Sequence, residues 1–97
     1  MVKLEIIANL AIEEDIIAAF ESAGYGDNFS WISPVHGRGG HGWREGSAIW
    51  PEENILYYLV INDDDLPELE RHLNDIKEKF PNEGLRCYIS RNIERLL

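Results

Sequence analysis

The 97-residue sequence predicts an α+β domain in which strands and helices follow one another in the order β-α-β-β-α-β. Two segments repeat apolar residues every three or four positions, as the buried face of a helix does. Two others, residues 2–9 and 85–89, alternate apolar and polar residues as a half-buried strand does, and two more, 29–35 and 55–61, are extended runs typical of strands. This is the element order of the ferredoxin-like fold (βαββαβ), a four-stranded antiparallel sheet with two helices on one face. The length suits a single domain that spans residues 1–97.

The first strand and the first helix are predicted before Gly24. The strand covers residues 2–9, and alternate residues form its apolar side: Val2, Leu4, Ile6 and Ala8. The next segment opens with acidic residues 13–15, which suit the positive end of a helix dipole. Apolar residues then recur at helical spacing, and Gly24 stands where this helix is expected to end.

Two strands and the second helix are predicted in the second half of the chain. The strands cover residues 29–35 and 55–61, and the helix starts in the acidic run before Leu66. Asp65 and Glu68 have the spacing of a capping box. Pro67 falls in the first turn, where its missing N–H costs no hydrogen bond.

The last strand is predicted over residues 85–89, with Leu85, Cys87 and Ile89 on its apolar side. Cys87 is therefore expected to be a buried small hydrophobe. As the only cysteine it cannot close an internal disulfide. His72 lies next to Leu73 in the second helix and is expected at a half-buried helix edge.

The composition excludes several classes of function. Nine basic and eighteen acidic side chains leave a net charge of −9, which argues against a nucleic-acid partner and against an anionic membrane surface. No apolar run is long enough for a signal peptide or a membrane span. We therefore expect a cytoplasmic protein without membrane insertion.

The strand 55–61 is apolar on both faces, which a sheet covered by helices on one side does not require. One face carries Leu56, Tyr58 and Val60, and the other carries the remaining apolar residues of the strand. An exposed apolar patch of this size is unusual on a soluble monomer. The sequence therefore predicts an oligomer.

The segment 36–50 is too long for an ordinary hairpin connection, which indicates either a function or a disordered excursion. Five of the eight glycines lie between Gly37 and Gly46. Arg38 and Arg44 against Glu45 give the segment a charge of +1 on an otherwise acidic chain. Converging backbone N–H groups and arginine side chains suit a phosphate or carboxylate ligand.

Two other interpretations of this segment stay open. His36 and His41 could ligate a divalent metal, with an oligomer supplying the ligands that two imidazoles lack. Ser47 could be a nucleophile, but no acidic residue is placed to orient a histidine base beside it. We therefore expect a non-enzymatic protein.

The sequence resembles the nitrogen regulatory PII-like superfamily, which includes the CutA-type proteins. The resemblance is carried by residues 35–39, by the segment 46–54 that leads into the strand 55–61, and by residues 80–85. It implies a homotrimer whose sheets face a central three-fold axis. The long segment 36–50 would correspond to the T-loop, which docks onto a transporter or an enzyme.

The resemblance also implies where an effector binds. The T-loop base would contact an adenine nucleotide or another anion through Gly37, Arg38, Gly39 and Gly40. The partner-docking part of the loop would be His41, Trp43, Arg44 and Glu45. The chain departs from the signalling members between its second helix and its last strand, where residues 81–84 replace a glycine-rich phosphate loop. The alternative function is that of a CutA-like trimer that binds a divalent metal.

Overall fold

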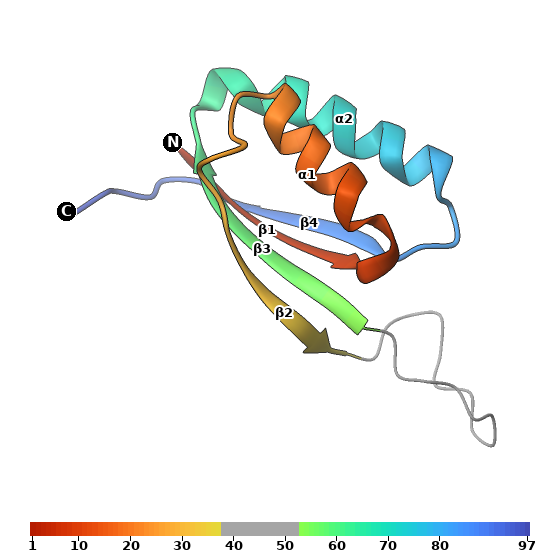
Figure 1. Cartoon of the computed structure of the whole chain (residues 1–97). Helices are drawn as coiled ribbons and strands as arrows, with labels where there is room; N and C mark the ends of the chain where they lie inside the picture. The colour runs from red at the N-terminus through yellow and green to blue at the C-terminus, as the bar shows by residue number, and fades with distance from the viewer. Residues whose placement is uncertain (38–52) are drawn as a thin grey trace.

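The computed structural model describes residues 1–37 and 53–97 (Figure 1). The strands are β1 (Val2–Asn9), β2 (Ser30–His36), β3 (Glu53–Ile61) and β4 (Leu85–Ser90). The helices are α1 (Glu13–Ser22) and α2 (Leu66–Lys79), each preceded by a 3-10 turn, η1 (Leu10–Ile12) and η2 (Asp63–Asp65). The predicted element order is confirmed, with strand ends within two residues of those expected.

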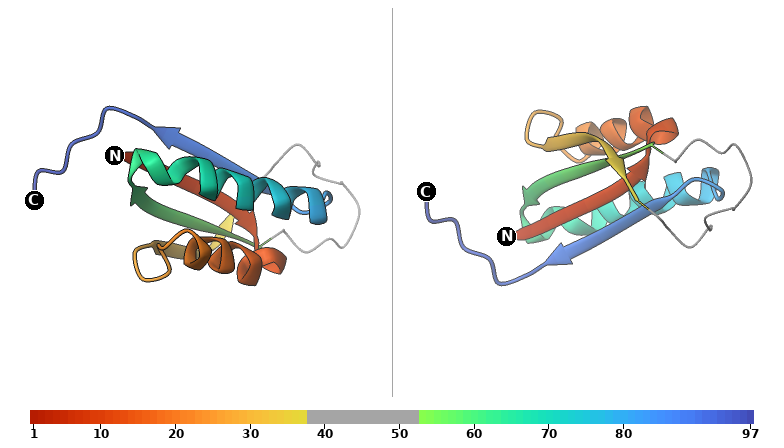
Figure 2. Two further views of the ribbon diagram at one scale, coloured as in Figure 1. Left: turned by 90° about the horizontal axis from the view of Figure 1, so that it is seen from above. Right: turned by 90° about the horizontal axis from the view of Figure 1, so that it is seen from below.

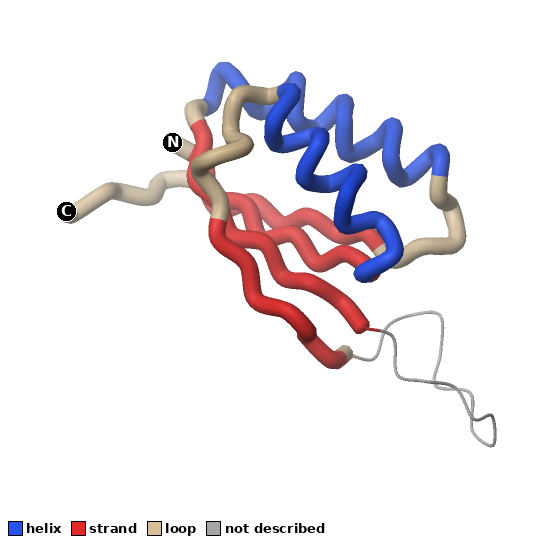
Figure 3. The backbone as a smooth tube through the Cα atoms, viewed as in Figure 1, coloured by secondary structure: helices blue, strands red, loops and turns tan. Residues whose placement is uncertain are grey.

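The four strands form one antiparallel sheet in the order β2-β3-β1-β4. Both helices lie on one face of this sheet, and the other face is left open (Figures 2 and 3). This is the predicted ferredoxin-like α+β fold. None of the helices in the described ranges is long and apolar enough to cross a membrane.

The core lies between the helices and the sheet. The predicted apolar side of β1 is fully buried, and β3 contributes Ile55, Tyr57, Leu59 and Ile61. The helices contribute Ile16, Ala19, Phe20, Leu69, Leu73 and Ile76. Phe20, Phe29 and Tyr57 form an aromatic cluster with ring centroids 4.9–6.1 Å apart.

Helix α1 begins and ends close to the predicted positions. The side chain of Asn9 accepts a hydrogen bond from the backbone N–H of Ala11 at 2.8 Å and so caps the turn η1 that leads into the helix. At the other end Gly24 has a φ of +88°, the left-handed conformation that glycine adopts without a steric penalty.

The predicted capping box of α2 is wrong. Asp65 stands at the N-cap position, but its side chain makes no capping hydrogen bond. It instead accepts a hydrogen bond from the Tyr25 hydroxyl at 2.5 Å, and that hydroxyl accepts one from the backbone N–H of Asn62 at 3.0 Å. Asp65 therefore links the connection after α1 to the start of α2. Pro67 lies in the first turn of α2, as predicted.

The open face of the sheet carries the apolar side chains that the sequence pattern of β3 predicted. Tyr58 is 48% exposed, and Leu56 and Val60 are half-buried. Ile7 and Ile32 flank Leu56 on the neighbouring strands and are also exposed. Lys3 lies over the Tyr58 ring at 5.8 Å and pairs with Glu5 at 3.3 Å. An apolar patch with one ion pair is thus left uncovered by the described part of this chain.

The buried hydroxyl of Tyr57 leads to a prediction. Tyr57 is 1% exposed, and its hydroxyl has no hydrogen-bond partner among the described residues. We expect Tyr57→Phe to leave the free energy of unfolding at pH 7 unchanged or to raise it by about 1 kcal/mol, because an unsatisfied buried group is removed. Denaturant unfolding measures this change.

Tyr57→Phe should also reduce the amount by which the free energy of unfolding falls at alkaline pH. Burial, with a smaller contribution from Glu13, raises the pKa of Tyr57 from 10.0 to about 12. The folded chain therefore holds this proton more tightly than the unfolded chain, and stability falls as the pH rises from 10 to 12. Tyr25→Phe is the matched control, since it breaks two hydrogen bonds and should cost about 1–3 kcal/mol. Clear destabilisation by Tyr57→Phe would contradict the prediction.

Candidate functional site

The candidate site is the end of the sheet where the segment 38–52 leaves β2 and returns to β3. His36 at the end of β2 pairs with Glu53 at the start of β3. Asn54 on β3 pairs with Val35 on one side and with Asn9 of β1 on the other. The strand ends are thus level with one another, and the segment starts from an ordered edge.

The connection between α2 and β4 reaches the same end of the sheet. The backbone N–H of Asn9 donates a hydrogen bond to the carbonyl oxygen of Gly84 at 2.9 Å. Two views, from the side and from above, place this connection, the end of β2 and the start of β3 at one end of the domain (Figures 1 and 2). Three parts of the chain that are far apart in the sequence therefore lie at the same end of the sheet: residues 9–12, the strand ends at 36–37 and 53–54, and residues 80–84.

The described residues of this site leave the backbone at Gly37 accessible. A Cβ added at Gly37 would meet nothing within 4 Å, so a ligand can approach its backbone closely. His36 and Glu53 are exposed, and Asn54 is half-buried. The described cation that the register brings closest is Arg86, which pairs with Ile7, two positions in from Asn9. An anion bound at Gly37 would therefore depend on Arg38 or on a neighbouring copy for its positive charge.

Two of the residues that the sequence analysis proposed for this site are described. His36 is the last residue of β2, one position beyond the predicted strand end, and Gly37 follows it. Arg38, Gly39 and Gly40 of the expected effector site lie outside the described residues. So do Ser47 and the expected docking residues His41, Trp43, Arg44 and Glu45.

The residues that the sequence analysis missed are Asn9, Gly84 and Arg86. Only the register of β1 with its neighbours brings Asn9 and Arg86 near the start of the segment 38–52. The one signal in the sequence is Pro81–Gly84, which ends the second helix and so predicts a connection at these residues. It does not show which strand end that connection lies next to.

The metal interpretation finds no support in the described ranges. No group of three or more His, Cys, Asp or Glu side chains is close enough there to hold a metal ion. His36 is exposed at the strand end, and His41 lies outside the described residues. His72, the third histidine, is half-buried on α2 with its Nε2 atom 3.7 Å from the Glu68 carboxylate, which fits the predicted helix edge.

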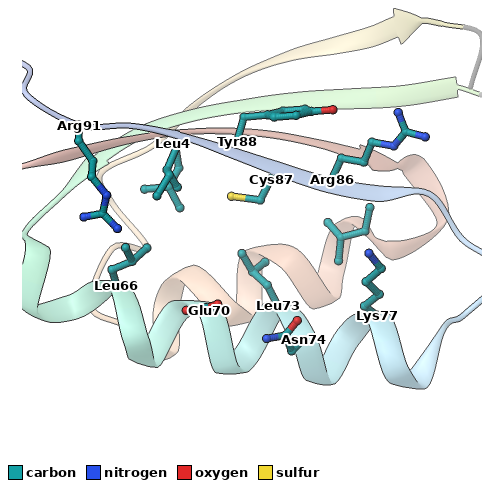
Figure 4. A pocket seen from close by; sticks show the side chains of 12 residues that line it. Leu4, Leu66, Glu70, Leu73, Asn74, Lys77, Arg86, Cys87, Tyr88 and Arg91 are labelled. Atoms are coloured by element: carbon teal, nitrogen blue, oxygen red, sulfur yellow. The ribbon is translucent and has the colours of Figure 1, made fainter.

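A groove of about 520 Å³ runs between α2 and β4 (Figure 4). Its apolar floor is formed by Leu4, Leu66, Leu73, Leu85, Cys87 and Ile89. The side chains of Lys77 and Arg91 lie toward its two ends, and Glu70 lines the side formed by α2. The groove exists because β4 is the edge strand and α2 does not cover it.

The prediction that Cys87 is buried is therefore wrong. Cys87 faces the helix side of the sheet, as predicted, but it is exposed in the groove. The surrounding atoms still shield the thiol enough that desolvation, with a smaller contribution from Glu70, raises its pKa from 9.0 to about 11. The thiol stays protonated at neutral pH and is a weak nucleophile there.

The fold is similar to that of PII-like proteins of known structure. CPII from Thiomonas intermedia K12, a nitrogen regulatory PII-like protein bound to ADP, AMP and bicarbonate, superposes with a TM-score of 0.74 at 18% identity. The alignment covers 99% of this chain and 94% of CPII. A structure of CPII bound to ADP and bicarbonate gives a TM-score of 0.69 at 20% identity, covering 92% of this chain and 82% of that one.

A second protein with this fold is a putative PII-like signalling protein from Thermus thermophilus. Its TM-score is 0.62 at 17% identity, over 92% of this chain and 83% of that chain. No protein-family model matches the chain, and no curated protein matches its sequence. At these identities the comparisons establish that the chain has the fold of PII-like proteins.

Proposed function

We propose that the protein is a PII-like regulator that binds an adenine nucleotide or another small anion at the base of the segment 36–50 and docks on a partner protein. It acts as a homotrimer and has no catalytic role of its own. Gly37, Arg38, Gly39 and Gly40 contact the effector. His41, Trp43, Arg44 and Glu45 contact the partner protein, a transporter or an enzyme.

One observation carries this proposal. The start of a long glycine-rich segment, the end of β1 and the α2–β4 connection meet at one end of the sheet, through the Asn9–Gly84 hydrogen bond and the pairing of Asn9 with Asn54. A ligand bound there would contact the residues at which the segment 36–50 begins. It could therefore favour one conformation of the segment over another and so control what the segment binds.

The choice of ligand is supported by chemistry and by the structural neighbours. CPII, which shares the fold, binds ADP, AMP and bicarbonate, all of which are anions. In this chain the glycine backbone around position 37 offers N–H donors, and Arg38 offers a guanidinium that can grip a phosphate or a carboxylate with two hydrogen bonds. The short Pro81–Gly84 connection leaves less backbone for a polyphosphate, which favours AMP or bicarbonate over ATP.

The homotrimer is supported by the open face of the sheet. Ile7, Ile32, Leu56, Tyr58 and Val60 leave an apolar patch there that no part of the described chain covers. Packing such a face against two further copies around a three-fold axis buries all three patches at once. The effector site would then lie at the edge between neighbouring sheets.

The first test is calorimetric titration with ADP, AMP and bicarbonate, followed by the variants Arg38→Ala and Arg44→Ala. We expect Arg38→Ala to weaken binding by about 1.5–3 kcal/mol, the range for hydrogen bonds to charged groups, with little effect on unfolding. Arg44→Ala should change effector binding much less and should weaken partner docking. Arg44 is the matched control because it lies in the same segment and carries the same charge.

Two results would count against the effector site. An equal loss of binding free energy in both variants would mean that the segment attracts anions by its net charge and that no site is formed at Gly37. If none of the three anions binds and Zn²⁺ or Cu²⁺ stabilises the folded protein, the metal interpretation is favoured over the effector site.

The second test concerns the homotrimer. We expect Tyr58→Glu to convert the assembly into folded monomers, because a carboxylate buried against two other copies costs several kcal/mol per chain. Lys3 lies beside this position and can pair with the new carboxylate in the monomer, so the fold should persist. Light scattering gives the mass, and circular dichroism reports the fold.

Tyr57→Glu is the comparison variant on the adjacent residue. Its side chain points into the core, where it is 1% exposed, so this variant should unfold the chain itself. A Tyr58→Glu protein that keeps the mass of the unmodified assembly would refute the contact at the open face.

A further inference from the structure

We propose that the α2–β4 groove binds an apolar chain that ends in an acidic group, a medium-chain fatty acid, and that Arg91 holds the acidic group. The groove lies on the helix side of the sheet, so the proposed packing of open faces leaves it accessible. The inference therefore goes beyond the proposed function and does not depend on it.

Strand β4 leaves helix-side residues exposed at positions that β1 and β3 bury. The helix-side apolar residues of β1 and β3 are at most 2% exposed. On β4, Cys87 pairs with Ile6 and Ile89 pairs with Leu4, so both face the helices. Cys87 is nevertheless exposed, and Ile89 is 43% exposed. An apolar ligand that removes this surface from water gains free energy roughly in proportion to the area covered.

Helix α2 forms the opposite wall of the groove along most of its length. The residues that line this wall follow one another at intervals of one, three or four, which places them on one face of the helix: Leu66, Glu70, Leu73, Asn74 and Lys77. At a rise of 1.5 Å per residue, the span from Leu66 to Lys77 gives a wall about 16 Å long. The volume of about 520 Å³ is that of a small-molecule site. A long groove of this volume suits an extended chain.

The two ends of the groove carry positive charge. Lys77 lies toward one end and Arg91 toward the other, and Figure 4 shows the Arg91 side chain directed toward Leu66. Neither cation forms an ion pair with another described residue. On a chain whose net charge is −9, unpaired cations at the ends of an apolar groove favour an anionic ligand. Arg91 suits a carboxylate better than Lys77, because its guanidinium donates two parallel hydrogen bonds.

The apolar floor favours an alkyl chain over a peptide. A peptide that pairs with the free edge of β4 lies in the plane of the sheet, so it does not fill the space between the sheet and α2. A peptide inside that space would place N–H and C=O groups against Leu4, Leu73 and Cys87 without hydrogen-bond partners. An alkyl chain carries no such groups, and its carboxylate stays at the charged end.

The thiol of Cys87 reports whether the groove is occupied, because it is the only cysteine in the chain. Decanoate, used below the concentration at which it forms micelles, should slow the modification of Cys87 by N-ethylmaleimide at least roughly tenfold at saturation. Desolvation raises the pKa of Cys87 to about 11, so the reaction is followed at one fixed alkaline pH. The double variant Cys87→Ser, Arg71→Cys is the control, since its one thiol lies on an exposed part of α2 outside the groove and should not be protected.

A second measurement tests the role of Arg91. In calorimetry, Arg91→Ala should raise the dissociation constant of decanoate at least roughly tenfold, as expected for the loss of a charge-assisted contact. Arg95→Ala is the matched control, because it removes the same charge from the same segment but does not line the groove. Decanol has the same chain without the charge, so Arg91→Ala should also remove the preference for decanoate over decanol.

Each contrary result overturns the inference. A Cys87 thiol that decanoate does not protect, or protects no better than the control thiol, shows that no chain lies in the groove. Equal effects of Arg91→Ala and Arg95→Ala refute the assignment of the acidic group. Protection of Cys87 without decanoate that rises with protein concentration means that a second copy covers the groove. None of these results depends on the binding of ADP, AMP or bicarbonate, so the proposed function is tested separately.

Discussion

The pairing of β1 on both of its sides is the constraint on which the rest of the structure depends. β1 pairs with β3 from Val2 to Asn9 and with β4 from Lys3 to Ala8. Its alternate side chains fill the core under both helices. A shift of one residue in either pairing would expose this whole apolar set, so the alternation in β1 fixes the position of both neighbours.

The candidate site follows from that register. Because Asn9 ends β1 opposite Asn54, the segment 38–52 returns to the sheet level with the end of the central strand. The Asn9 backbone then reaches Gly84, which brings the α2–β4 connection to the same place. Backbone pairing and one backbone hydrogen bond join these three parts of the chain. The core places them, and the chemistry of the site can therefore vary without loss of the fold.

The sequence was sufficient to predict the fold because its signals are local. The alternation in β1, the apolar run of β3 and the helical spacing in α1 and α2 each indicate burial of a segment against its immediate neighbours. Asp65 and Cys87 were misassigned because their surroundings depend on distant parts of the chain. Asp65 has the spacing of a capping residue, yet its carboxylate accepts a hydrogen bond from the hydroxyl of Tyr25, forty positions earlier. Cys87 has the pattern of a core residue, yet it sits on an edge strand that α2 leaves open.

Charge connects the candidate site to the assembly. The chain carries a net charge of −9, and Glu53 lies exposed at the end of the sheet where an anion would bind. Such an end attracts an anion only when cations are concentrated there, and in the proposed function Arg38 would supply one of them per copy. In the proposed homotrimer a neighbouring copy would be the source of a further cation; within this chain Arg86 lies near the site end of β4, whereas Arg91 follows the far end of that strand. An effector bound between two copies of the proposed homotrimer would stabilise the assembled form by mass action, so effector concentration and subunit association would be coupled.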